Sequence, residues 1–113
     1  MNIYVRPWGY FVVLEDSSTI KVKKIVVAPR SKLSLQKHLH RSESWYLASG
    51  EGYAVINDNL IKLYKEHVVI IPKNTQHRLI NNSDKQLVII EIWCGDNLSE
   101  SDIERLEDDY GRV

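Results

Sequence analysis

The sequence predicts an all-β fold, and two observations support this prediction. Short runs rich in Val, Ile and aromatic residues recur along the 113-residue chain, and turn-forming residues separate them. No helical pattern interrupts these runs before residue 99. Many short strands at this spacing favour an antiparallel sandwich or barrel, in which closure also protects the strand edges.

Each predicted strand is an apolar run bounded by a turn signal. Residues 1–9 contain Arg6-Pro-Trp-Gly9 and form an extended lead-in that ends in a turn. Strands are then predicted at 10–15, 19–28, 36–40, 45–48, 53–56, 60–64, 68–71, 77–81 and 86–93. The turns between them include Asp16–Ser18, Pro29–Ser31, Ser49–Gly52, Asn57–Asn59 and Asn82–Asp84. Lys21 and Lys23 share a face if their strand is regular, and solvent exposure is expected for each.

Only the tail departs from the β pattern. Residues 99–107 begin with capping residues, and Ser101 and Glu104 have the spacing of a capping box. A helix of one or two turns is therefore predicted here, with Ile103 and Leu106 on its buried side.

Composition predicts a single domain over residues 1–113, because a chain of this length encloses one core. Lys+Arg and Asp+Glu both number 15, which gives no long-range attraction to nucleic acid or to an anionic membrane. The one cysteine, Cys94, cannot form an internal disulfide. No apolar leader or long apolar segment is present, so we expect a cytoplasmic protein.

Two separated stretches of the sequence carry side chains of the types that commonly bind metals. Alternation along a strand places Gln36, His38 and His40 on one face, and Glu43 returns beside them after a turn. His77 follows a turn that begins with proline. A solvated strand face explains any one of these residues alone. Together, one amide oxygen, two imidazoles and one carboxylate suit a divalent ion and leave positions open for water or substrate.

The predicted ligands are Gln36, His38, Glu43 and His77, and their spacing is the cupin pattern. Gln36, His38, Glu43 and Gly50 match its first half, and Pro72, Asn74, His77 and Asn81 match its second half. Further motifs are Arg6-Pro-Trp-Gly9, Leu33-Ser-Leu-Gln36, Glu43-Ser-Trp45, His77-Arg-Leu79, Ile90-Glu91 and Asp102-Ile103. Together they resemble the cupin domain of type II mannose-6-phosphate isomerases, which in many bacteria is the C-terminal part of a bifunctional mannose-1-phosphate guanylyltransferase.

The resemblance implies a double-stranded β-helix (jelly-roll) barrel, a homodimer, and interconversion of mannose 6-phosphate and fructose 6-phosphate for GDP-mannose and polysaccharide synthesis. The sequence has no glycine-rich phosphate loop, so we expect at most the isomerase activity. Such an isomerase passes through a cis-enediolate, which a divalent metal stabilises. Zinc is the first choice, with Mn, Fe, Co and Ni as alternatives.

The reaction also needs a general base and cations for the phosphate. Lys23, His40 and Glu91 are the candidate bases. The candidate phosphate-binding residues are Arg41, Arg78, Arg105 and Arg112. Arg78 is the first choice and is also assigned to the catalytic group, because it directly follows a predicted ligand. Glu107 and Asp108 offer an alternative, in which the last two arginines form a structural charge network.

Departures from the family pattern leave the substrate open. Leu39 and Ser44 stand where the family usually carries histidines, and Arg30 replaces a glycine. Two alternatives therefore remain: a cupin enzyme acting on another sugar phosphate or a nucleotide sugar, and a non-catalytic sugar-binding cupin.

Overall fold

The computed structural model describes residues 2–112, and these residues form twelve strands and no helix. In chain order the strands are β1 (Ile3–Arg6), β2 (Gly9–Asp16), β3 (Ile20–Val27), β4 (Ser31–Lys32), β5 (Leu35–Lys37), β6 (Arg41–Ser49), β7 (Tyr53–Ile56), β8 (Asn59–Lys62), β9 (Val68–Ile71), β10 (His77–Asn81), β11 (Leu87–Gly95) and β12 (Glu104–Glu107). No helix in this range could cross a membrane.

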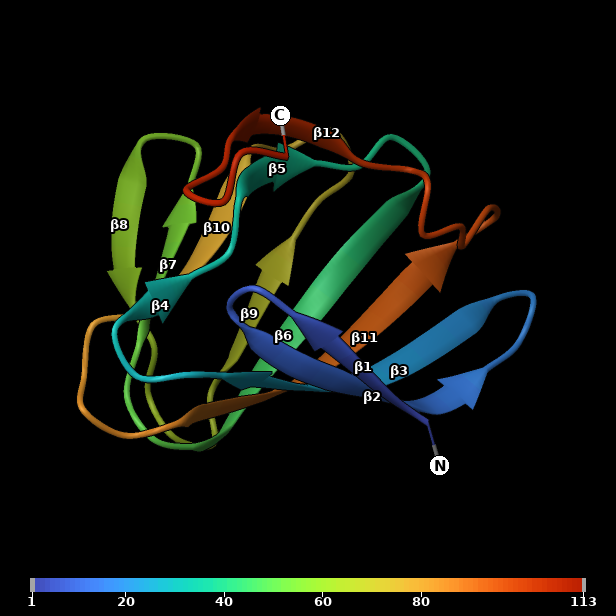
Figure 1. Cartoon of the computed structure of the whole chain (residues 1–113). Helices are drawn as coiled ribbons and strands as arrows, with labels where there is room; N and C mark the ends of the chain where they lie inside the picture. Colours follow the sequence, from blue (N-terminus) through green and yellow to red (C-terminus); the bar gives the residue numbers. More distant parts are fainter. Residues whose placement is uncertain (1, 113) are drawn as a thin grey trace.

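The strands form two antiparallel sheets that face each other (Figure 1). One sheet has the order β1-β2-β3-β11-β6-β9. The other has the order β12-β5-β10-β7-β8, and β4 also pairs with β10. Because β11 lies between β3 and β6, Glu91 is paired with Lys23 on one side and with Trp45 on the other. This long-range pairing brings together residues that are far apart in the sequence.

The core fills the space between the two sheets. Its buried residues are Trp8, Phe11, Ile25, Val27, Trp45, Leu47, Ala54, Leu63, Ile71, Leu79, Leu87 and Ile89. Side chains alternate between buried and partly exposed along β11, so Glu91 and Trp93 point to the same side as Leu87 and Ile89. A carboxylate is therefore held at the interior face of a sheet.

The Arg6-Pro-Trp-Gly9 motif closes the turn between β1 and β2. Trp8 enters the core, and its carbonyl oxygen accepts a hydrogen bond from the amide of Ala28. Gly9 has a φ of 149°, and a side chain there would overlap the carbonyl oxygen of Val26. Both features fix the fold at this corner.

Asn81 joins the ends of several segments inside the protein. Its side chain is 1% exposed, and its amide nitrogen donates to the carbonyl oxygens of Val27, Ala28 and Lys85. Its amide oxygen accepts from the backbone and the hydroxyl group of Ser83. The last residue of the cupin pattern is thus a structural one.

The predicted C-terminal helix at 99–107 is wrong. Glu104–Glu107 instead form β12, which pairs with β5 and places Arg105 opposite Gln36. The two serines of the predicted cap hydrogen-bond each other, and the carboxylate of Asp102 accepts from the amides of Leu39 and His40. Strand pairing with β5 outweighs the local capping signal, because a helix here would leave the outer edge of β5 unpaired.

Most predicted strands are confirmed to within one or two residues. The strand predicted at 45–48 begins earlier, at Arg41, and the short strand Ser31–Lys32 was not predicted. Two further segments differ. Ile3–Arg6 form a regular edge strand rather than a simple lead-in. The strand predicted at 36–40 ends at Lys37, after which the chain turns. His40 is therefore exposed and does not share a face with Gln36 and His38. The expected exposure of Lys21 and Lys23 is also wrong, because both are buried.

Candidate metal centre

Three of the predicted ligands meet inside the barrel. His38 follows β5, Glu43 lies on β6 and His77 begins β10, and each is buried. One ligand atom from each of the three lies within 4.8 Å of the others. Nε2 of His38 is 3.2 Å from Oε2 of Glu43, and Nε2 of His77 is 3.6 Å from Oε1 of the same carboxylate. This triad can hold a metal ion.

Both imidazoles are oriented through their other nitrogen. Nδ1 of His38 lies 2.6 Å from the carbonyl oxygen of Asp102, and Nδ1 of His77 lies 2.8 Å from the carbonyl oxygen of Thr75. A carbonyl oxygen can only accept, so each Nδ1 carries a proton and Nε2 is the ring nitrogen that faces Glu43. Outer hydrogen bonds of this kind are typical of metal-binding histidines. The donor set therefore fits a divalent ion.

The electrostatics keep this cluster ready to bind a cation. Burial lowers the pKa of His38 to about 4, so its imidazole is neutral at pH 7. Burial by itself raises the pKa of Glu43, but the nearby His77 and Arg41 outweigh it and the pKa falls to about 2. Glu43 is therefore a carboxylate. It also accepts hydrogen bonds from Nε of Arg41 at 2.8 Å and from Nε1 of Trp45 at 3.1 Å.

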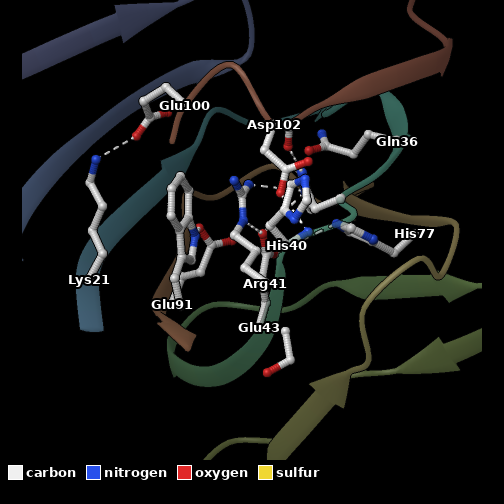
Figure 2. Close-up of polar contacts among 12 residues, drawn as sticks. Lys21, Gln36, His40, Arg41, Glu43, His77, Glu91, Glu100 and Asp102 are labelled. Carbon is white, nitrogen blue, oxygen red and sulfur yellow. Dashed lines mark hydrogen bonds and ion pairs between the residues drawn. The ribbon is translucent and has the colours of Figure 1, made fainter. Parts of the chain in front are cut away.

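Gln36, the fourth predicted ligand, lines the cavity beside this triad. Its amide nitrogen donates to the hydroxyl group of Ser34 at 3.0 Å, so its oxygen is the atom that it can offer to a metal. Figure 2 shows Gln36, Glu43 and His77 around the same cluster, with Arg41 among them.

Arg41 lies at the candidate metal centre itself. Nη2 of its guanidinium group is 3.1 Å from Nε2 of His38, and Nη1 donates to the carbonyl oxygen of Ser99. The guanidinium also lies 3.3 Å from the centroid of the Trp93 ring. Arg41 therefore neutralises Glu43 and borders the place where a metal would bind.

A cavity of about 170 Å³ opens beside the triad. It is lined by charged residues from both sheets and from the C-terminal segment: Arg6, Lys23, Arg41, Glu43, Glu91, Glu100, Arg105 and Arg112. Of the three candidate bases, Lys23 and Glu91 line this cavity. His40 does not belong to the lining and points to solvent, while its amide donates to Asp102 at 2.9 Å.

The carboxyl group of Glu91 is buried beside this cavity. Burial and the neighbouring charge of Glu43 raise its pKa to about 8. Its carboxyl group accepts a hydrogen bond from Nε1 of Trp93. Burial also lowers the pKa of Lys23 from its ordinary value. Perturbed groups beside a cavity are typical of sites that transfer protons.

The candidate phosphate-binding arginines divide into two groups. Arg105 and Arg112 line the cavity, and Nε of Arg105 is buried without a hydrogen-bond partner among the described residues. Nε of Arg112 lies 2.8 Å from a carboxylate oxygen of Asp108. This ion pair agrees with the alternative interpretation, in which the arginines near the C-terminus form a structural charge network. Arg78 lies outside the cavity lining. Its Nε donates to the carbonyl oxygen of Leu33 at 2.8 Å, because it points to the opposite side of β10 from His77.

Three residues at this site had no predicted role. Arg6 and Glu100 line the cavity, and Asp102 orients His38. Arg6 and Asp102 both lie in motifs that the resemblance had already marked. Glu100 carried no sequence signal, because it reaches the site from a segment without regular structure.

Comparison with known proteins is consistent with this geometry. Residues 1–108 match the family described as mannose-6-phosphate isomerase C-terminal. The alginate biosynthesis protein AlgA of Pseudomonas aeruginosa is 42% identical over 108 residues, which are 96% of this chain and 22% of the relative. The xanthan biosynthesis protein XanB of Xanthomonas campestris is 39% identical over 96% of this chain and 23% of the relative. The chain thus spans about a fifth of the length of these relatives.

Solved structures show the fold. The cupin domain of Schizosaccharomyces pombe Cnp3 superposes with a TM-score of 0.75 at 13% identity, covering 85% of this chain and 69% of that one. A cupin 2 conserved barrel domain protein of Salinispora arenicola gives a TM-score of 0.72 at 21% identity, covering 82% and 81%. The predicted cupin fold is confirmed by these similarities.

Proposed function

The chain belongs to the mannose-6-phosphate isomerase C-terminal family, and we propose that it interconverts mannose 6-phosphate and fructose 6-phosphate as a metal-dependent isomerase. The observation that supports this most strongly is the buried triad of His38, Glu43 and His77. Its carboxylate, Glu43, lines a cavity that Lys23 and four arginines also line. A neutral sugar would not need several arginines, whereas a sugar phosphate does.

We propose that the triad, together with the amide oxygen of Gln36, holds a divalent ion. Zinc is the first choice for two imidazoles and a carboxylate, with Mn, Fe, Co and Ni as alternatives. When bound, the ion supplies positive charge where the sugar oxygens become negative in the cis-enediolate. Arg41 donates to Oε2 of Glu43, the carboxylate oxygen that also faces His38, and thereby fixes the orientation of the carboxylate.

Glu91 is the residue that we propose moves the proton between C1 and C2. It lines the cavity, and its pKa of about 8 lies near neutral pH, where a group can both accept and return a proton. Lys23 is its neighbour on β3 and is the second candidate. His40 is less suitable because its side chain faces solvent.

Arg105 and Arg112 are proposed to bind the phosphate. The unpartnered Nε of Arg105 is a buried donor that a phosphate oxygen would satisfy. Arg6 lines the same cavity from the β1 side. Arg41 borders the proposed metal site instead. Arg78 donates to the carbonyl oxygens of Leu33 and, in the C-terminal segment, Glu107.

The test is turnover of mannose 6-phosphate by the purified protein loaded with each metal, followed by coupled detection of fructose 6-phosphate. His38→Ala and His77→Ala should lose both bound metal and turnover, whereas His67→Ala, which changes an exposed histidine, should keep both. No turnover of mannose 6-phosphate with any metal would overturn the proposed reaction. Metal retained at full occupancy by both triad variants would overturn the metal site.

A panel of sugar phosphates and nucleotide sugars, run in the same assay, separates this activity from that of a related cupin enzyme. Ligand binding without turnover would identify a sugar-binding cupin instead. The homodimer implied by the resemblance stays a prediction, which sedimentation of the purified protein tests.

A further inference from the structure

A second cavity, of about 350 Å³, lies next to the proposed catalytic cavity. Its lining includes Tyr4, Arg6, Phe11, Lys21 and Glu100. Arg6, Phe11 and Glu100 also line the catalytic cavity, so the two spaces share one wall. Nothing in the proposed isomerisation uses this second space.

Glu100 stands at the shared wall and binds two buried lysines. Its Oε2 atom lies 2.6 Å from Nζ of Lys23 and 2.9 Å from Nζ of Lys21. The side chains of Lys23 and Lys21 are 3% and 9% exposed, whereas that of Glu100 is 51% exposed. Figure 2 shows Glu100 joined to Lys21 on the side of the cluster away from His77.

The charges at this position are unequal. Two ammonium groups share one carboxylate at short range, because both lie within 2.9 Å of Oε2 of Glu100 whereas Asp16 is 63% exposed and 3.9 Å from Lys21. Buried ammonium groups favour full charge compensation, since desolvation is costly for an unpaired ion. A phosphate group, with a charge near −2 at pH 7 and several acceptor oxygens, matches two lysines better than one carboxylate does.

Glu100 is also easy to displace. It lies in the segment between β11 and β12, where the chain forms turns without strand pairing. Its carboxylate faces solvent on one side, so it can move out without unfolding a strand. The two lysines belong to the central part of a sheet and stay in place.

We propose that Lys21 and Lys23 form a second anion subsite, which Glu100 fills in the ligand-free protein and which a second phosphate group enters by displacing it. The chemical class that fits both cavities is a sugar with two phosphate groups. Tyr4 and Phe11, whose rings stack at 4.9 Å, and the Arg6 guanidinium, 5.0 Å from the Phe11 ring, form an aromatic and cationic wall beside the lysines. This inference rests on the proposed function, because the first phosphate takes the Arg105 end of the catalytic cavity.

The test compares binding of fructose 6-phosphate and fructose 1,6-bisphosphate by titration calorimetry. The second compound has a phosphate at C1, so it cannot isomerise and reports binding alone. The protein should bind the bisphosphate about tenfold more tightly, as expected for an added charge-assisted contact. Lys21→Met should reduce this preference to within about twofold and leave fructose 6-phosphate affinity unchanged. Glu100→Gln, which removes the competing charge, should increase the preference.

Lys62→Met is the matched control, because it removes an exposed lysine on β8 and should change neither affinity. Circular dichroism confirms that each variant is folded. Equal affinity of the two sugars, or a preference that survives in Lys21→Met, would overturn the second subsite. The proposed isomerase is tested separately by binding and turnover of the monophosphates, so either hypothesis can fail alone.

Discussion

The carbonyl oxygen of Asp102 lies 2.6 Å from Nδ1 of His38 and fixes which imidazole nitrogen faces Glu43. The carboxylate of the same residue accepts from the amides of Leu39 at 3.0 Å and His40 at 2.9 Å. One residue from the C-terminal segment thus holds both the ring of a proposed ligand and the turn that follows it. The segment that was predicted to be a helix thus orients a residue of the candidate metal centre.

Asp102→Ala should weaken metal binding by about 10- to 100-fold, the usual effect of losing an outer partner of a metal-bound histidine. The reason is that the carbonyl loses its position when the carboxylate no longer binds the turn. Competition with a chelator measures the affinity. Asp109→Ala, which removes only a partly exposed ion pair with Lys32, should leave the affinity unchanged. If Asp102→Ala bound the metal as tightly as Asp109→Ala does, this account of Asp102 would be contradicted.

Arg78 and Arg105 are expected to behave in opposite ways. Arg78→Met removes a donor to the carbonyl oxygen of Leu33 and should lower the free energy of unfolding by about 1–3 kcal/mol while leaving KM unchanged. Arg105→Met should raise KM by about tenfold or more, because the phosphate loses a buried donor. Urea denaturation and steady-state kinetics measure both effects. A larger increase in KM for Arg78→Met than for Arg105→Met would reverse the assignment.

Glu91 should make the protein less stable as the pH rises. Its pKa is about 8 in the folded protein and near 4.5 in the unfolded chain, so the folded state binds the proton more tightly. Between these two pH values the unfolded state carries fewer protons, and the free energy of unfolding falls with increasing pH. This contribution is fully present below about pH 4.5 and is lost through about pH 8.

Glu91→Gln keeps the shape of the side chain and cannot titrate. Its stability, measured by urea denaturation at several pH values, should therefore fall less between pH 4.5 and pH 8 than that of the wild type. The same variant should lose turnover while keeping its metal. Parallel stability profiles for the two proteins would show that Glu91 is ionised in the folded state.

Asn81→Ala should lower the free energy of unfolding by about 3 kcal/mol, because it leaves several buried partners without hydrogen bonds. Asn82→Ala changes the exposed neighbouring residue and should cost much less. Metal content per folded molecule should not change in either variant. A small effect at Asn81 would mean that water replaces its side chain.

The sequence by itself determined the β class, most strand positions and the residue types of the metal triad. Alternating apolar residues and turn signals are local features, so they predict strands such as Tyr53–Ile56 and Val68–Ile71 directly. The spacing of His38, Glu43 and His77 was also informative, because those residue types at that spacing match a known family.

Tertiary structure alone decided what the other polar residues do. The capping signal at Ser101 predicted a helix, but the available edge of β5 selected a strand instead. Arg78 follows a proposed ligand in sequence and points to the opposite side of its strand, whereas Glu100 carries no motif and reaches two buried lysines. Strand pairing joins residues distant in the chain, so the surroundings of a charged side chain depend on contacts that no local pattern specifies.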